Sequence, residues 1–212
     1  WLGLYWVSSI QSNLNIGIRH LLPIYPFMII LVSGRITWFL DYLQKTNLRV
    51  WRGAGLVLAA LMGWYVFETV HAYPFFLPYF NQVALLRPPW VTEGQAGYIP
   101  GGYNYVADSN VDWGQDLKRL GQWMSTNGVS KIDLDYFGWA DQSYYIGNRF
   151  TWVHNTTYKN RKDFIKRNQS DGWIAVSTTF LQNSKPDADY WWLNQIEPTT
   201  TIGHSIFVWQ IR

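Results

Sequence analysis

Apolar residues follow two patterns along the chain, and the change between them falls near residue 90. The run GAGLVLAALMGWYVFETVHAY, residues 53–73, carries no charge before Glu68. A helix needs ~20 mostly apolar residues to cross the hydrocarbon core of a bilayer. Trp and Tyr residues at and towards the ends of this run suit the membrane interfaces. We therefore predict a membrane span at 53–73.

A second apolar run, residues 20–40, contains LLPIYPFMIILVSGRITWFL. Pro23 and Pro26 remove helix hydrogen bonds, which neighbouring helices or water can replace inside a bundle. Arg35 must either reach the interface with its long side chain or mark the end of the span. We predict a span here as well.

The segment between these spans is basic, and its basic residues outnumber the single acid, Asp41. Short basic loops stay on the cytoplasmic side of a membrane. This bias predicts that the loop is cytoplasmic, and that Arg19, His20 and everything after about Tyr73 lie outside. The basic residues of the segment are Arg35, Lys45, Arg49 and Arg52.

After residue 90 the pattern alternates between short apolar strands and amphipathic helices. Strands are predicted in 103–108, 131–138, 172–179 and 204–212, and helices in 113–128, 160–169 and 187–195. Such alternation is typical of an α/β layer with a partly parallel sheet. The predicted fold is thus a membrane α-helical part at 1–89, which ends in an interfacial segment, followed by a small extracytoplasmic α/β domain at 90–212.

An acidic cluster, Asp108, Asn110, Asp112 and Asp116, lies between a predicted strand and the helix that follows it. Asp112 precedes Gln115 by three residues, the spacing of a capping box in a looser form. Asp116 falls in the first helical turn, where negative charge suits the helix dipole. Asp108 and Asn110 stand where open α/β sheets commonly bind ligands, so they are candidate substrate-binding residues, although Asn110 also fits ordinary turn chemistry.

Composition excludes some classes of protein. The chain has 17 basic and 14 acidic residues, and the excess lies beside apolar segments, so we expect no nucleic-acid partner. It has no cysteine, which removes disulfides and thiolate metal sites. We expect no metal centre and no cofactor, while a divalent cation stays open. The chain opens on Trp1 within an apolar pattern, and we interpret it as a piece of a longer protein.

Four segments together resemble one family: NIGIRHLLPIYPF, PYFNQ, VADSNVDWGQDLKRL and the ending GHSIFVWQIR. They are similar to the C-terminal region of bacterial phospholipid-carrier-dependent glycosyltransferases, glycosyltransferase family 39, which is related to protein mannosyltransferases and the aminoarabinose transferase. The similarity extends over nearly the whole chain, and its most specific part is DSNVDWGQDLKRL, residues 108–120.

The resemblance implies a multi-span enzyme of GT-C type in the bacterial inner membrane. Such an enzyme transfers a hexosyl or pentosyl group from a polyprenyl-phosphate donor to a glycan or protein acceptor on the outer side. It also implies that the catalytic acid lies in an external loop upstream of this chain, so the catalytic residues are unknown here. Arg19 and His20 match the family's Arg-His pair before Leu-Pro, which assigns them to the lipid phosphate of the donor.

Two other readings stay open. The chain could be a non-catalytic, membrane-anchored module that binds glycan or protein through its many aromatic residues. It could also be an anchored hydrolase that uses two of Asp108, Asp112 and Asp116 as an acid/base pair, which requires carboxyl groups ~5–9.5 Å apart on either side of a bond.

Overall fold

The computed structural model describes residues 1–11, 17–82, 86, 102–106, 108–184 and 189–212, with the side chains of 17–20 and 108 left out of the description. The chain forms two compact units, Trp1–Phe76 and Leu77–Arg212. The predicted boundary at residue 90 falls outside the described residues, as does part of the predicted interfacial segment, residues 83–85 and 87–90.

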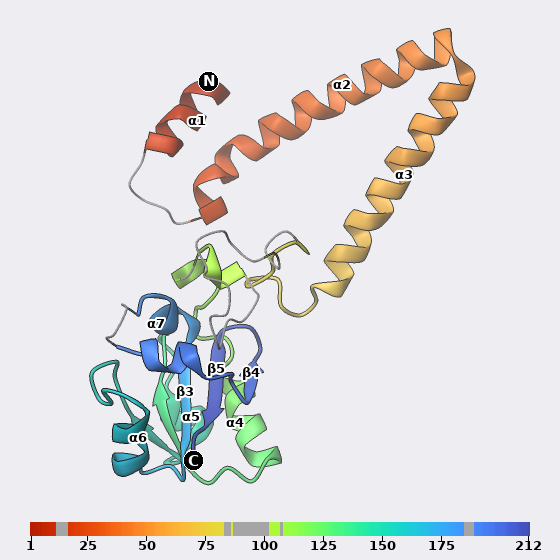
Figure 1. Ribbon diagram of the computed structural model, residues 1–212. Coiled ribbons are helices and arrows are strands. Elements are labelled where there is room, and N and C mark those ends of the chain that lie inside the picture. Colours follow the sequence, from red (N-terminus) through yellow and green to blue (C-terminus); the bar gives the residue numbers. More distant parts are fainter. Residues whose placement is uncertain (12–16, 83–85, 87–101, 107, 185–188) are drawn as a thin grey trace. The chain divides into compact units, whose positions relative to one another are not determined.

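The first unit is helical, and its two long helices are α2 (Tyr25–Thr46) and α3 (Leu48–His71). Both are long and apolar enough to cross a membrane. A single residue, Asn47, separates them (Figure 1). Its side-chain oxygen accepts hydrogen bonds from the N–H groups of Arg49 and Val50, so Asn47 caps α3 and allows an immediate turn. The unit also contains α1 (Leu2–Gln11) and the 3₁₀ helix η1 (Gly17–Ile24).

The prolines of the first predicted span lie where they do little harm to the helix. Pro23 belongs to η1, and Pro26 lies in the first turn of α2, where the N–H group it lacks has no helical partner. Arg35 does not end the helix, because α2 continues to Thr46. The apolar side chains of α2 and α3 are almost all exposed, which is unfavourable in water and suits a lipid environment.

The second unit is a mixed α/β domain. Its strands are β1 (Ile132–Asp135), β2 (Phe150–Trp152), β3 (Trp173–Ser177), β4 (Thr200–Ile202) and β5 (Ile206–Gln210). Its α-helices are α4 (Leu117–Thr126), α5 (Gln142–Ile146), α6 (Arg161–Arg167) and α7 (Thr178–Gln182). The described 3₁₀ helices include η3 (Gly102–Asn104), η4 (Asp108–Asn110) and η5 (Trp191–Gln195).

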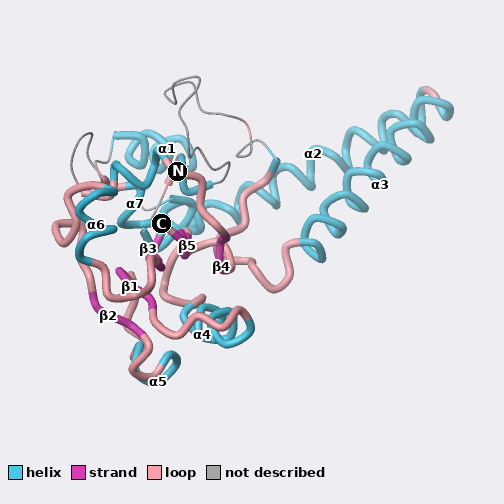
Figure 2. The backbone as a smooth tube through the Cα atoms, turned by 60° about the horizontal axis from the view of Figure 1, so that its bottom comes forward, coloured by secondary structure: helices cyan, strands magenta, loops and turns pink. Residues whose placement is uncertain are grey.

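The sheet has the strand order β2-β1-β3-β5-β4, drawn in magenta in Figure 2. β1 is parallel to both β2 and β3, whereas β5 is antiparallel to β3 and β4. The predicted partly parallel α/β sheet is therefore confirmed. The chain leaves β1 towards β2 on one side and returns past β1 to β3 on the other, so the connecting helices α5 and α6 lie on opposite faces.

Each face of the sheet carries its own hydrophobic core. On one face, β1 contributes Ile132 and Leu134 to a core with α4 and α5. On the other, β3 contributes Ile174 and Val176 to a core with α6, α7 and η5. Figure 1 shows α4 and α6 on opposite sides of the sheet. Side chains alternate between faces along a strand, so a short hydrophobic strand contributes to both cores. The domain therefore has three layers, with helices on each face of the sheet.

Some predicted elements are wrong. The described residues among 103–108 do not form a strand; they lie in the 3₁₀ helices η3 and η4 and in the turn that follows η3. The helix predicted at 113–128 begins later, at Leu117, and ends before Gly128, whose φ of +67° suits the glycine at a helix end. The short elements α5, β2, α7 and β4 were not predicted, because three to five residues carry too little periodicity to be read.

Candidate functional site

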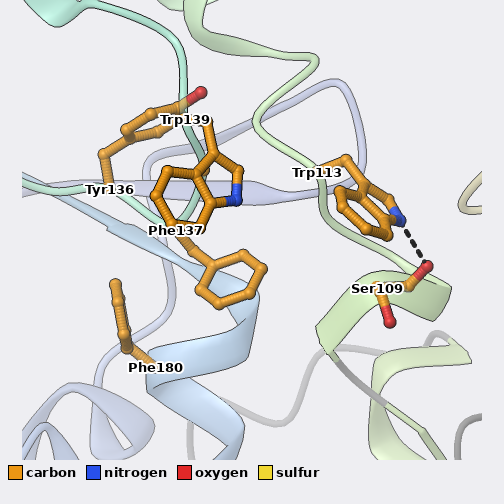
Figure 3. A pocket seen from close by; sticks show the side chains of 7 residues that line it. Ser109, Trp113, Tyr136, Phe137, Trp139 and Phe180 are labelled. Carbon is orange, nitrogen blue, oxygen red and sulfur yellow. Dashed lines mark hydrogen bonds between the residues drawn. The ribbon is translucent and has the colours of Figure 1, made fainter.

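A pocket of about 420 Å³ opens at the carboxyl ends of β1 and β3. At this point the chain leaves the two strands in opposite directions, and open α/β sheets bind ligands at such a position. Its walls are mainly aromatic: Trp113 faces Phe137, Trp139 and Phe180 across the opening (Figure 3). The lining is completed by Ser109, Tyr136 and Gly138.

Two glycines join the walls of the pocket. A Cβ built on Gly138 would lie 2.7 Å from the Cα of Gly114, so the two backbones meet without room for a side chain. Gly114 has φ of +80° and Gly138 of +146°, conformations that favour glycine. Trp113 and Trp139 are the chain neighbours of these glycines, so this contact fixes the backbone beside the two tryptophans.

Further hydrogen bonds hold the pocket walls. The Trp113 indole Nε1–H donates to the Ser109 carbonyl at 2.8 Å, which fixes the ring against η4. The Phe137 N–H donates to Ser177 Oγ at 2.9 Å, which ties the end of β1 to the end of β3. The Tyr136 hydroxyl donates to the Gly114 carbonyl at 2.9 Å. These groups are satisfied within the protein, so the aromatic faces dominate the surface of the pocket.

Asp108 and Asn110, the predicted substrate-binding pair, belong to η4. The Asp108 side chain lies outside the described residues, and Asn110 is half-buried beside Ser109. Asn110 is not among the residues that line the pocket. The expected strand before them is absent, so the carboxyl strand ends that form a ligand site here are those of β1 and β3.

Asp112 does not cap a helix, and this prediction is corrected by the structure. Its Oδ1 accepts a hydrogen bond from the Gly114 N–H at 2.9 Å, while α4 begins at Leu117. The side chain is fully buried. Burial raises the pKa of Asp112 to about 6. The Gly114 N–H and the Ser177 and Ser205 hydroxyls favour the charged form and so limit this rise. The Gln115 side chain accepts from the Trp113 N–H, so no capping box forms.

Asp116 is the residue that joins α4 to the turn between β4 and β5. Its carboxylate accepts hydrogen bonds from the His204 N–H and the Ser205 hydroxyl, and pairs with Arg119. A Cβ on Gly203 would lie 2.1 Å from the Asp116 carboxylate, so glycine is required there. These contacts give Asp116 and the Gly203-His204-Ser205 segment a structural role.

The burial of Asp112 and Asp116 weakens the hydrolase reading. Both carboxyl groups are fully buried, and Asp116 is occupied by its three partners. An acid/base pair must reach a substrate bond from two sides, which two enclosed carboxyl groups do not do.

Two further acids are buried on β1, and no local pattern singles them out. The Tyr158 hydroxyl donates to Asp133 at 2.5 Å, and the Tyr190 hydroxyl donates to Asp135 at 2.6 Å. Burial raises the pKa of both carboxyl groups, and the tyrosine hydroxyls oppose that rise. Burial, together with the neighbouring acid, also raises the pKa of each tyrosine. These pairs connect β1 to the segments that precede α6 and η5.

Arg19 and His20 lie in η1, immediately before α2, and their side chains are outside the described part of the chain. Their assignment to a donor phosphate stays a prediction. Within the described residues, no three His, Asp or Glu side chains are grouped so that they could hold a metal ion.

Sequence reasoning missed the residues that line the pocket. The signal was present in the run YFGW, residues 136–139, which follows a predicted strand and ends in glycine and tryptophan. Its partner, Trp113, lies inside the segment read as an acidic cluster. Only the pairing of β1 with β3 shows that these aromatic residues and Phe180 meet. Comparisons with protein families, with curated proteins and with solved structures gave no match to this chain.

Proposed function

We propose that this chain is the C-terminal part of an integral-membrane glycosyltransferase that takes a sugar from a polyprenyl-phosphate donor outside the cytoplasm. The observation that carries the proposal is the pair of apolar helices α2 and α3, preceded directly by the Arg19-His20 sequence. A lipid-linked donor presents its phosphate at the depth of the headgroups. A cation beside the end of a span is placed to meet it there.

Arginine suits this role chemically. Its planar guanidinium offers a fork of N–H groups that matches phosphate oxygens, and it stays charged at every physiological pH. An arginine next to hydrocarbon is costly unless it reaches phosphate or water. The alternative for Arg19 is a simple interfacial anchor with its charge in water.

The α/β unit is then the external domain of the enzyme. The basic residues around the α2–α3 turn favour a cytoplasmic position for that turn, so the chain after α3 continues on the outer side. In this proposal the catalytic acid belongs to an upstream loop, and Asp112 and Asp116 support the domain.

The test is a kinetic series on the full-length enzyme in liposomes, with the polyprenyl-phosphate sugar as the varied substrate. A charge-assisted hydrogen bond contributes ~1.5–3 kcal/mol, so Arg19→Ala is expected to lower kcat/KM for the donor by about ten- to a hundredfold. Arg19→Lys keeps the charge but loses the fork, and should recover only part of the loss.

Arg49→Ala, at the opposite end of the helical pair, is the matched control and should leave donor use unchanged. If Arg19→Ala inserts normally and uses the donor as wild type does, Arg19 is an anchor and the phosphate assignment is wrong. If the wild-type enzyme transfers sugar from none of the polyprenyl-phosphate donors, the chain is not a transferase of this class.

A further inference from the structure

The pocket at the ends of β1 and β3 exposes aromatic faces that a folded domain would ordinarily cover. The Trp139 side chain is 95% exposed and that of Trp113 is 51% exposed, although both line a concave site. Large apolar side chains gathered at a concave surface mark a binding site more often than a structural feature.

The Trp113 ring, the Phe137–Phe180 wall and the backbone beside Trp139 are held in position before any ligand arrives. The Trp113 ring is fixed by its bond to the Ser109 carbonyl, and the Gly114–Gly138 contact fixes the backbone beside both tryptophans. Phe137 and Phe180 pack edge to face with centroids 5.8 Å apart, which supports the opposite wall. A preformed site loses less conformational entropy on binding.

The charges around the pocket favour a neutral ligand. Among the residues whose side chains the structure describes, none that lines the pocket is charged. The buried Asp112 lies behind the wall, next in the chain to Trp113, and would repel an anion when ionised. A phosphate or carboxylate would therefore find no cationic partner among the described lining residues, and a lipid-phosphate headgroup is a poor fit.

We propose that this pocket binds one or two rings of a neutral saccharide, with the C–H face of a sugar ring stacked on Trp139 and Trp113. An aromatic face carries negative charge density, and the C–H groups of a pyranose face carry a small positive charge. The cavity of about 420 Å³ lies in the size range of small-molecule sites. The inference goes beyond the donor reaction and does not depend on Arg19.

The experiment measures saccharide binding to the full chain in lipid nanodiscs by saturation-transfer NMR. The probes are neutral methyl glycosides of common hexoses, pentoses and N-acetylhexosamines, and their disaccharides. At least one probe should bind, with signal transfer to the C–H protons of one ring face. Trp139→Ala should weaken this binding about tenfold or more.

Trp152→Ala is the matched control, since Trp152 is also an exposed tryptophan of the same domain but does not line the pocket; it should bind as wild type does. Arg19→Ala should also bind normally, so a failure of the donor proposal is distinguishable from a failure of this one. The proposal is overturned if no glycoside binds, or if Trp139→Ala binds as well as wild type. It is also overturned if n-octanol competes for the pocket at lower concentration than any saccharide, which would identify a general apolar site.

Discussion

Gly114 and Gly138 meet backbone to backbone, and a Cβ on Gly138 would lie 2.7 Å from the Gly114 Cα and 2.6 Å from the Tyr136 hydroxyl oxygen. The contact brings the segment before α4 against the end of β1. It therefore joins two parts of the chain that are 24 residues apart in sequence, and both parts contribute residues to the lining of the pocket.

Gly138→Ala should separate these segments, because the new methyl group overlaps backbone and the φ of +146° is unfavourable for alanine. Gly128→Ala is the matched control: Gly128 also has positive φ, +67°, but nothing lies within 4 Å of its Cβ position. We expect Gly138→Ala to destabilise the region by ~1–3 kcal/mol more than the control. Hydrogen exchange of peptides around 112–116 and 134–140 in the intact chain measures the difference; equal protection in both variants would contradict the contact.

The second prediction concerns Asp112 and pH. Burial raises the pKa of Asp112 from 3.8 to about 6, so between these values the folded state holds a proton that the unfolded state releases. The contribution of this carboxyl group to the free energy of unfolding is therefore fully present below about pH 4. It is lost as pH rises through about 6. The difference between the folded and unfolded pKa values corresponds to ~3 kcal/mol in the free energy of unfolding.

Asp112→Asn removes this dependence, since the amide does not ionise. Urea unfolding of residues 77–212, followed from about pH 4 to about pH 8, should show wild type losing stability relative to Asp112→Asn as pH rises. Taking the difference between the two proteins cancels the other titrating groups, such as Asp163, whose pKa is lowered. Parallel curves for the two proteins would show that the carboxyl group is not buried as described.

Much of the sheet was predictable from sequence because two of its interior strands, β3 and β5, contain continuous apolar runs. These strands are buried on both faces, at IAV 174–176 and IFVW 206–209. A strand that is buried on both faces can be recognised as a continuous hydrophobic run, even though its apolar and polar residues do not alternate. The helices α4 and α6 were predictable for a similar reason: α4 shows its apolar stripe and Asn160 caps α6 through the Asp163 N–H.

The site was less predictable because its parts are brought together by tertiary contacts. Asp112 stands in a sequence position that suits a helix cap, yet its Oδ1 bonds the Gly114 N–H within a turn. The choice between cap and turn depends on Gly114 packing against Gly138, which no local pattern reports. Nothing in the local sequence distinguishes Trp139 from other aromatic residues; its place in the pocket follows only from the pairing of β1 with β3.

The third prediction tests the buried pair of Tyr190 and Asp135. Tyr190→Phe removes the hydroxyl that donates to Asp135 at 2.6 Å and leaves a buried carboxyl group without that partner. We expect a loss of ~1–3 kcal/mol in the free energy of unfolding. The hydroxyl favours the charged form of Asp135 and so opposes the rise in its pKa that burial causes; the loss should therefore be greater where Asp135 is ionised than in acid.

A double-mutant cycle with Asp135→Asn isolates the interaction. In the Asn background Tyr190→Phe should cost less, because no buried charge is left unpaired. Tyr144→Phe is the control, since Tyr144 is 81% exposed and its change should be close to neutral. Additive effects of Tyr190→Phe and Asp135→Asn would mean that the hydroxyl and the carboxyl group do not stabilise each other.

The last prediction concerns the membrane orientation on which the proposed function depends. Lys45 lies in the last turn of α2 and Arg49 in the first turn of α3, so both charges gather at the Asn47 turn. Positive charge near short loops is retained on the cytoplasmic side. We therefore expect reporter fusions at Lys45 and at Gly128 to report opposite compartments, cytoplasmic for the first and external for the second.

Removal of these charges provides the sharper form of this test. Replacing Lys45, Arg49 and Arg52 together with glutamine should weaken or invert the bias, because the orientation follows the count of Lys and Arg rather than the net charge. The matched control replaces Lys162, Lys166 and Arg167 of the α6 region with glutamine, which lies far from the spans in sequence and should leave the orientation unchanged. Identical compartments for the two wild-type reporters would exclude a two-span arrangement of α2 and α3, and with it the external position proposed for the α/β unit.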